Sequence, residues 1–451
     1  MPELIIAYGI FGVYLVILLL IGFLVSKRIK NVTDFLLAGR RIGFWLCMFT
    51  LAATHFGGGF VMGGGEYGFI HGLSGAWYGI ACGLGLILLG FIAPRLRKLS
   101  LFTAPDYLAL RYKSKLVRLL ATFLSLVAIM GILAAQVIAA QGVLSMLGMD
   151  PAVGSLVAAL VFILYTFIGG MWAVTLTDFF QLLVVGVGMI ISFVLVITQV
   201  DFLAFSSVTS TYTSILGMGY STIIWILLPT IFYTLIGQDF YQRLFSSKSE
   251  KIGQRSCFAA GVFLLIMSFI PALLGMSARV LLGSEIAPGQ ALPSLLMEVM
   301  PAPMGYFFLV AIIAAIMSTA DSLLSAGASH IVKDVLQESF GKKNNLLFYS
   351  KISTVGLGFG ALLIAFLSPT VIDVLVYAYT IYTSTIFIPL VLGMFWKRGS
   401  KEAAIGSILG SSVFIVLSIL LVKTDIPLEI FGVVVSLLIY SLISLVRPAK
   451  S

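Results

Sequence analysis

Residues 51–66 read LAATHFGGGFVMGGGE, and this stretch decides the fold because six glycines interrupt an apolar segment. The surrounding segment, residues 43–70, is long and apolar enough to cross a hydrocarbon core about 30 Å thick. Glycine costs about 1 kcal/mol relative to alanine inside a helix. In lipid, unwound backbone is tolerated only where protein buries it or where it lines a cavity. The stretch therefore predicts a membrane-spanning helix that is broken near its middle.

The composition of the whole chain predicts an all-α integral membrane protein. Hydrophobic residues make up 60% of the 451 residues and charged residues 10%, whereas a soluble domain carries about 25% charged residues. The first apolar run, residues 4–25, is too long for the core of a signal peptide and predicts a span. The polar stretches between the runs are short, which predicts a single transmembrane domain over residues 1–451.

About thirteen transmembrane helices are expected from the apolar runs. Their approximate ranges are 5–26, 43–70, 73–94, 117–147, 152–170, 178–199, 220–243, 254–279, 302–331, 347–368, 371–394, 402–422 and 427–446. The span at 220–243 contains Pro229 and Gly237, so it is predicted to be broken as well. Interrupted helices at matching places in two halves are typical of inverted-repeat transporters with a site at the midplane. Glycines that only permit close helix packing are the alternative.

This pattern divides the chain into an extra N-terminal helix (5–26), a first repeat (43–199), a second repeat (220–394) and two C-terminal helices (402–446). Of the 27 Lys and Arg residues, only Arg279 and Lys423 fall outside if the N-terminus is outside and the C-terminus is cytoplasmic. The positive-inside rule therefore favours that orientation in the plasma (cell inner) membrane. It also explains the net charge of +9 without a nucleic-acid partner, and we expect no obligatory protein partner.

One face of the span at 302–331 is small and rich in oxygen. Ala315, Ser318, Thr319 and Ser322 recur at helical spacing, and Asp321 lies beside them. Hydroxyls, carbonyls and one carboxylate are ligands that a hard cation such as sodium accepts. Alternatively, the hydroxyls bond only to carbonyls of their own helix.

Other polar residues within spans have structural alternatives. Thr177 as a helix N-cap, with Asp178 in the first turn, would account for Asp178 by capping alone. Asp239 and Arg243, four residues apart, are interpreted as a helix ion pair at the inner surface. Gln136 is either a substrate residue or a bridge between helices.

Two motifs resemble those of the sodium:solute symporter family. They are GGMWAVTLTDFFQ at residues 169–181 and AAIMSTADS at residues 314–322, and the resemblance covers roughly residues 8–400. It implies a leucine-transporter-type 5+5 inverted repeat with an extra N-terminal helix, working by alternating access. It also implies a sodium ion as co-transported cofactor, held by the carbonyls of Ala53, Phe56 and Ala315 and the hydroxyls of Ser318 and Thr319. A second sodium or proton site would involve Ser318 again, with Asp178, Asp321 and Ser322.

Local motifs are most similar to the choline transporter branch of that family, but the tryptophan positions of that branch are His55, Leu133 and Gly237 here. The aromatic cage that a quaternary ammonium needs is therefore expected to be missing, and His55 suits an amino acid, an organic acid or a sugar instead. The candidate substrate residues are His55, Gly57, Gly58, Gly59, Phe60, Gln136, Tyr233 and Gln238.

The resulting prediction is a sodium-coupled symporter that carries a small organic solute across the lipid bilayer into the cell. A proton-coupled or uncoupled carrier centred on Asp321 is the alternative, and a membrane sensor or a channel is a weaker one. An enzyme is not expected, because His55, His71 and His330 are not spaced as metal ligands and no nucleophile–base set is present.

Overall fold

The computed structural model describes residues 2–367, 371–421 and 428–449, and within these ranges helices joined by turns and loops make up the secondary structure, apart from one isolated β-bridge between Ile42 and Ser247. The α-helices are α1 (Pro2–Ser26), α2 (Val32–Leu37), α3 (Phe44–His55), α4 (Gly64–His71), α5 (Trp77–Lys98), α6 (Ala104–Tyr112), α7 (Lys115–Met146), α8 (Pro151–Ile197), α9 (Phe202–Val208), α10 (Tyr220–Ile236), α11 (Gln238–Ser246), α12 (Glu250–Met267), α13 (Phe269–Leu282), α14 (Ala291–Val299), α15 (Ala302–Ser329), α16 (Leu346–Leu367), α17 (Val371–Phe387), α18 (Gly393–Phe395), α19 (Lys401–Leu421) and α20 (Leu428–Val446). Shorter 3-10 or π segments are η1 (Ala38–Arg40), η2 (Gly59–Gly63), η3 (Gly72–Ala76), η4 (Pro288–Gln290), η5 (His330–Ser339) and η6 (Ile388–Leu392). The predicted span ends at residues 368, 422 and 427, and Lys423, lie outside the described residues.

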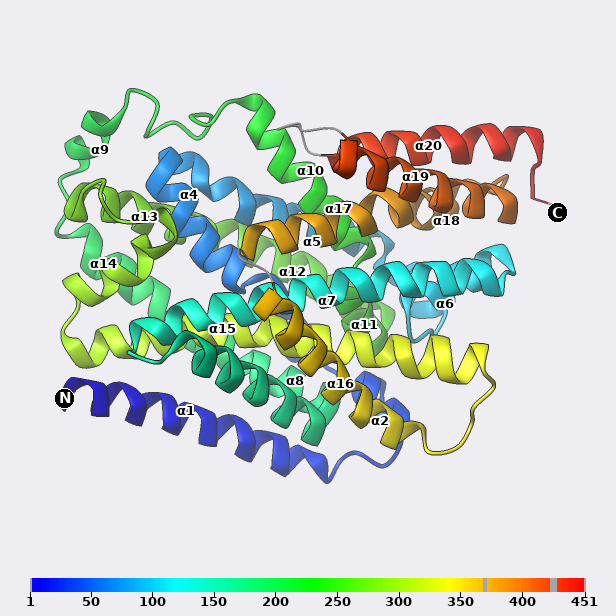
Figure 1. Cartoon of the computed structure of the whole chain (residues 1–451), viewed down its shortest axis with the longest axis horizontal. Coiled ribbons are helices and arrows are strands. Elements are labelled where there is room, and N and C mark those ends of the chain that lie inside the picture. Colours follow the sequence, from blue (N-terminus) through cyan, green and yellow to red (C-terminus); the bar gives the residue numbers. More distant parts are fainter. Residues whose placement is uncertain (1, 368–370, 422–427, 450–451) are drawn as a thin grey trace.

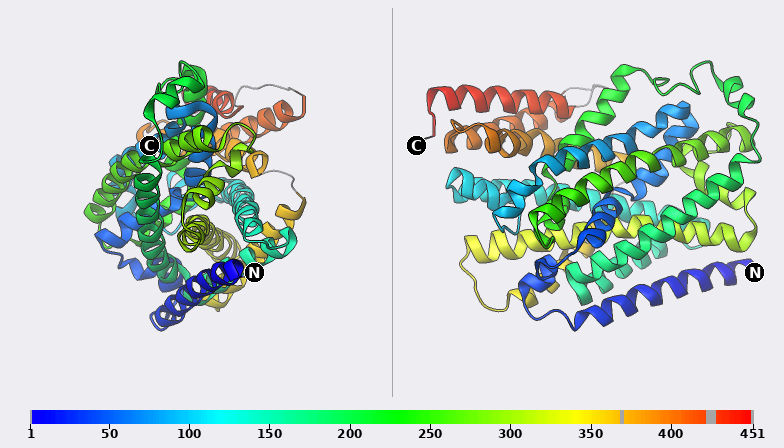
Figure 2. Two further views of the ribbon diagram at one scale, coloured as in Figure 1. Left: turned by 90° about the vertical axis from the view of Figure 1, so that its left-hand side faces the viewer. Right: turned by 180° about the vertical axis from the view of Figure 1, so that it is seen from behind.

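The long helices run roughly along one axis of the molecule, and the two termini lie at its opposite ends (Figure 1). The short helices α2 and α6 lie at one end, and α9 and α14 lie at the other. Helix α15 lies in the core of the bundle. In the apolar stretch within Pro303–Ser339, 94% of the residues are buried, whereas in that within Ile5–Ser26, on α1, only 22% are buried. Figure 2 shows α1 along one edge of the bundle, where its apolar side chains would face lipid.

Ten helices of the described chain are long and apolar enough to span a membrane, or eleven if one bent pair is a single span. The predicted count of thirteen is not confirmed by this criterion. Helix α8 shows one reason why the counts differ. If its 47 residues formed one straight helix, it would be about 70 Å long, which is more than twice the hydrocarbon thickness. Gly170 breaks α8 at φ 49°, ψ −147°, and a side chain there would meet Phe35. The predicted spans 152–170 and 178–199 therefore lie on either side of this break.

Both predicted helix breaks are confirmed. Helix α3 ends at His55, Phe56 leaves the helical region at ψ 40°, and the chain re-enters a π-helical turn at Gly59. In the second half, Gly237 at ψ 128° separates α10 from α11, which are bent by 43°.

The second glycine cluster has a different role from the first. Gly64 and Gly65 are helical, and a Cβ added at Gly64 would lie 3.0 Å from the Cβ of Pro271. Likewise, a Cβ at Gly275 would collide with the carbonyl of Gly65. The packing alternative therefore applies to this cluster, which lets α4 approach α13 closely.

Candidate functional site

The break in α3 meets the polar face of α15. The Ser318 hydroxyl lies 3.1 Å from the carbonyl oxygen of Ala53 and 2.8 Å from that of Ala315. The Thr319 hydroxyl lies 3.2 Å from the carbonyl oxygen of Thr54. Ser318 therefore contacts a carbonyl of its own helix and one of α3, whereas Thr319 donates across to α3, so both interpretations of this face apply. The result is a cluster of carbonyl and hydroxyl oxygens between the two helices.

This cluster has the donor set that sodium accepts: oxygen atoms that together carry little charge. Four of the five predicted groups meet there, from Ala53, Ala315, Ser318 and Thr319. Phe56, the fifth, lies at the break itself, and its ring packs 4.5 Å from that of Phe60.

A second polar cluster, one helical turn further along α15, is organised by Arg243 of α11. This side chain is fully buried. Its guanidinium forms an ion pair with Asp178 at 3.1 Å, donates to the Ser322 hydroxyl, and donates to the Thr50 hydroxyl at 2.9 Å. Thr50 in turn donates to Asp178. Arg243 thus lies among the residues for which the sequence predicted a second sodium or a proton.

The prediction of a surface ion pair between Asp239 and Arg243 is wrong. Arg243 donates to the backbone carbonyl of Asp239 at 2.8 Å, and its carboxylate partner is Asp178 of α8. Both residues are buried, because α11 begins at a helix break inside the bundle and not at the membrane surface.

Asp321 lies next to this ion pair but makes none of its own within the described residues. It accepts hydrogen bonds from Tyr165 at 2.5 Å, from Thr177 at 3.4 Å and from Ser322 at 3.3 Å. Thr177 is therefore not an N-cap: its hydroxyl bonds back to the carbonyls of Ala173 and Val174 inside α8. Capping does not account for Asp178, which lies two turns beyond the break at Gly170.

A small cavity of about 30 Å³ lies beside the two helix breaks. A cavity needs about 10–15 Å³ to hold a water molecule, so this one has room for two or three. Its lining consists of Thr54, His55, Gly57, Gly58, Gly59, Tyr78, Ile132, Gln136, Tyr233, Asp239, Phe240, Thr319, Leu323 and Tyr379. Any organic solute would therefore require the surrounding helices to move apart.

Six of the eight predicted substrate residues line this cavity: His55, Gly57, Gly58, Gly59, Gln136 and Tyr233. The other two do not. Phe60 packs against Phe56. Gln238 accepts a bond from the N–H of Ala104 at 2.8 Å and donates to Ser329 at 3.0 Å, so it connects α11 to α6 and α15.

The cavity also contains groups that the sequence did not assign to the substrate site, among them Asp239, Phe240 and Tyr379. Asp239 accepts a hydrogen bond from the Tyr233 hydroxyl at 3.2 Å. Tyr233 lies 4.6 Å from Tyr379, and His55 lies 4.4 Å from Phe240, measured between ring centroids. Of these rings, only that of His55 stands at one of the three tryptophan positions of the choline branch, so the gathering of Tyr233, Phe240 and Tyr379 here is revealed only by the three-dimensional packing.

Comparisons with known proteins show similarity over most of the chain. The sodium:solute symporter family matches residues 35–410. The high affinity choline transporter 1 of Homo sapiens is 28% identical over 428 residues, which are 87% of this chain and 73% of the relative. The high-affinity proline transporter PutP of Bacillus subtilis (strain 168) is 29% identical over 440 residues, 88% of this chain and 89% of the relative.

Among solved structures, the substrate-bound outward-open state of a Na+-coupled sialic acid symporter superimposes with a TM-score of 0.86. The match covers 99% of both chains at 22% identity. At this identity the likeness shows the fold, which is that of leucine-transporter-type symporters.

Proposed function

The chain belongs to the sodium:solute symporter family, and on that premise we propose that it is a plasma-membrane carrier that couples sodium entry to uptake of a small organic solute by alternating access. The observation that carries this proposal is the oxygen cluster formed by Ala53, Ala315, Ser318 and Thr319 at the break in α3. Sodium bound there would bridge α3 and α15 through neutral carbonyl and hydroxyl oxygens.

The arrangement also supports coupling between sodium and solute. Thr319 contributes to the oxygen cluster and lines the cavity, and Thr54 does the same from the opposite helix. An ion that fixes these two residues would also fix one wall of the solute pocket. Each ligand would then raise the affinity for the other by the same factor, as linkage requires.

A thermal-shift comparison of the purified protein in sodium and in potassium buffer tests sodium binding. Sodium at a hundred times its Kd should raise the free energy of unfolding by about 2.7 kcal/mol. Ser318→Ala should abolish the difference between the buffers. Ser277→Ala is the matched control, because Ser277 is equally buried but bonds only to the Leu273 carbonyl of its own helix. Equal melting temperatures of the wild type in both buffers would remove the case for sodium.

We propose further that the solute carries an ammonium group. The carboxylate of Asp239 and the rings of Tyr78, Tyr233, Phe240 and Tyr379 surround the cavity. A carboxylate attracts an ammonium directly, and aromatic faces attract it through their quadrupoles. The same carboxylate would repel an organic acid that has no amine. The choline and proline named for the two relatives both contain such a cationic nitrogen.

A solute panel in sodium buffer tests this class. Amino acids and quaternary amines should raise the melting temperature, whereas dicarboxylates and hexoses should not. Asp239→Asn should weaken the hits by roughly tenfold to a hundredfold, the range expected for a hydrogen bond to a charged group. Asp201→Asn in an exposed loop should leave them unchanged. Hits confined to sugars or to amine-free acids would contradict the ammonium assignment while leaving sodium coupling intact.

Proton coupling through Asp321 is a second candidate, favoured by one observation. This carboxylate is fully buried and makes only neutral hydrogen bonds within the described chain, since Arg243 pairs with Asp178. Solute hits that appear equally in both buffers but depend on pH, and that vanish in Asp321→Asn, would favour it over sodium.

A further inference from the structure

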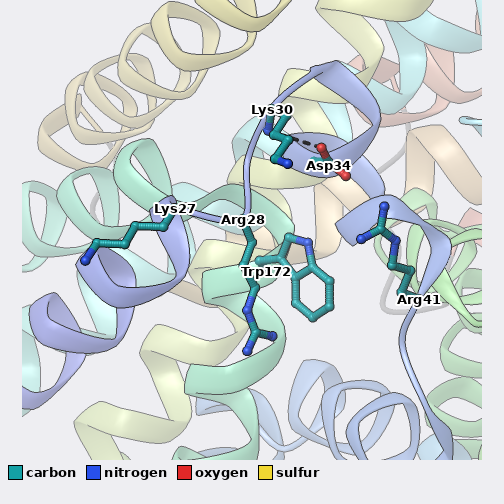
Figure 3. A pocket seen from close by; sticks show the side chains of 6 residues that line it. All are labelled: Lys27, Arg28, Lys30, Asp34, Arg41 and Trp172. Carbon is teal, nitrogen blue, oxygen red and sulfur yellow. Dashed lines mark hydrogen bonds between the residues drawn. The ribbon is translucent and has the colours of Figure 1, made fainter.

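A basic hollow of about 460 Å³ lies where α1, α2 and α8 approach one another. Figure 3 shows its six lining side chains: Lys27, Arg28, Lys30, Asp34, Arg41 and Trp172. The four basic residues follow α1 or flank α2, and Trp172 comes from α8, two residues after the break at Gly170. The hollow shares no lining residue with the solute cavity, and its lining is mainly basic.

The positive charge of this hollow is not neutralised by the protein. Its one acid, Asp34, accepts a hydrogen bond from the backbone N–H of Lys30 at 3.1 Å. Within the described chain, none of the four basic side chains forms a salt bridge. The neighbouring Arg40 differs, because it donates to backbone carbonyls of Phe245 and Ser100. Four cations and one carboxylate leave a net positive charge in the hollow, which would attract an anion.

The position of the hollow indicates where that anion would come from. Helix α1 exposes apolar side chains on its outer face, and Leu20, Phe23 and Leu24 are 54%, 60% and 63% exposed. The helix ends at Ser26 and the hollow begins at Lys27. Basic and aromatic residues directly after a lipid-facing helix lie at the level of the headgroups. The Arg28 guanidinium lies 5.2 Å from the Trp172 ring centroid, in a cation–π contact.

We propose that this hollow binds the phosphate headgroup of an anionic phospholipid, on the side of the membrane that the basic loops assign to the cytoplasm. Arg28 and Arg41 present planar guanidinium groups, which suit bidentate contact with phosphate. Lys27 and Lys30 add positive charge. The acyl chains would lie along the exposed face of α1. A bound lipid would thereby connect α1 and α2 to the turn of α8, which leads to Asp178.

The chain offers a matched comparison site. A second basic hollow of about 450 Å³ is lined by Arg97, Lys98, Ser100, Lys248, Ser249, Glu250 and Lys251. It has the same number of cations but no aromatic side chain. If generic basic charge were sufficient for lipid binding, both hollows would bind alike.

Native mass spectrometry of the detergent-purified full chain tests the proposal, with phosphatidylglycerol and phosphatidylcholine as probes. We expect a tight phosphatidylglycerol adduct that the double variant Arg28→Gln/Arg41→Gln weakens by on the order of tenfold or more. The control Lys248→Gln/Lys251→Gln should leave the affinity of this adduct unchanged. If Arg28→Gln/Arg41→Gln does not fold, Lys27→Gln/Lys30→Gln, which alters two exposed side chains, should weaken the adduct in the same direction.

Three results would overturn the proposal. They are equal binding of phosphatidylcholine, an unchanged affinity in the variants of this hollow, or loss of the adduct only in the control variant. Displacement of phosphatidylglycerol by millimolar inorganic phosphate would assign the hollow to a free anion instead of a lipid. None of these readouts depends on which ion or solute the protein carries.

Discussion

Arg243 is the residue whose contacts differ most from those predicted from the sequence. A buried guanidinium costs several kcal/mol of desolvation, which is offset only when its hydrogen bonds and its counter-charge are all in place. Here Asp178 supplies the charge, and Thr50, Ser322 and the Asp239 carbonyl accept the remaining bonds. The ion pair and its hydrogen bonds therefore connect α3, α8, α11 and α15 at one point.

Loss of this cation should destabilise the protein strongly. Arg243→Gln leaves the Asp178 carboxylate buried and unpaired, which we expect to cost about 3–5 kcal/mol in the free energy of unfolding. Arg243→Gln/Asp178→Asn should recover part of this loss, because no lone charge remains. Lys401→Gln, which breaks an exposed ion pair with Glu402, should cost about 1 kcal/mol or less. Thermal unfolding in detergent measures all three. A melting temperature of Arg243→Gln equal to that of wild type would contradict the role described here.

The oxygen-rich face of α15 could be predicted from the sequence, and the partners of Arg243 and Asp239 could not. Ser318 and Thr319 follow helical spacing within one helix, so their common face can be derived from the sequence alone. Arg243 and Asp239 are four residues apart, which predicts a local pair. Their actual partners, Asp178 and Tyr233, depend on how α11 enters the bundle after the break at Gly237.

At the scale of elements, the unwound turn at Gly57 allows α3 to touch α15. A Cβ at this position would collide with the Thr319 hydroxyl and lie 3.5 Å from the Ala315 carbonyl. By contrast, a Cβ at Gly63, in the π-helical turn that follows, would have nothing within 4 Å. Of these two glycines, six residues apart, Gly63 therefore has space for a methyl group and Gly57 does not.

Gly57→Ala should abolish sodium-dependent stabilisation, whereas Gly63→Ala should preserve it. The added methyl at Gly57 must displace Thr319, and with it one wall of the oxygen cluster. At Gly63 the backbone is already helical, so alanine fits and should change stability by less than about 1 kcal/mol. The measurement is the difference in melting temperature between sodium and potassium buffer for each variant. Sodium stabilisation of Gly57→Ala equal to that of wild type would contradict the contact between the break and α15.

Element boundaries were predictable where polarity changes abruptly. The break after His55 and the one at Gly237 follow from glycine and proline within apolar runs. The count of spans was harder, because short turns such as that at Gly170 join two spans into one continuous helical segment. Hydropathy does not distinguish a tight turn at the membrane surface from a kink inside it.

At the scale of the whole molecule, a buried hydrogen-bond network lies toward the end that contains α6. There His330 lies 2.8 Å from Asp334 and 2.8 Å from Ser125, and Thr103 donates to Asp334 at 2.8 Å. These bonds connect α6, α7 and η5. In a transport cycle of the proposed kind, we expect this network to rearrange when solute leaves toward the cytoplasm, because it joins helices at the end that the positive-inside rule assigns to that side.

The orientation of the molecule gives the last prediction, since the positive-inside rule favours α6 on the cytoplasmic side and the end of α13 on the outer side. Ser284→Cys and Lys397→Cys each introduce an exposed thiol, at opposite ends of the bundle. The native cysteines at 47, 82 and 257 are buried and free, so they should contribute little background. A membrane-impermeant maleimide applied to intact cells should label Ser284→Cys, and should label Lys397→Cys only after permeabilisation. The reverse pattern would invert the molecule, and the basic hollow at the end of α1 would then face the outer leaflet.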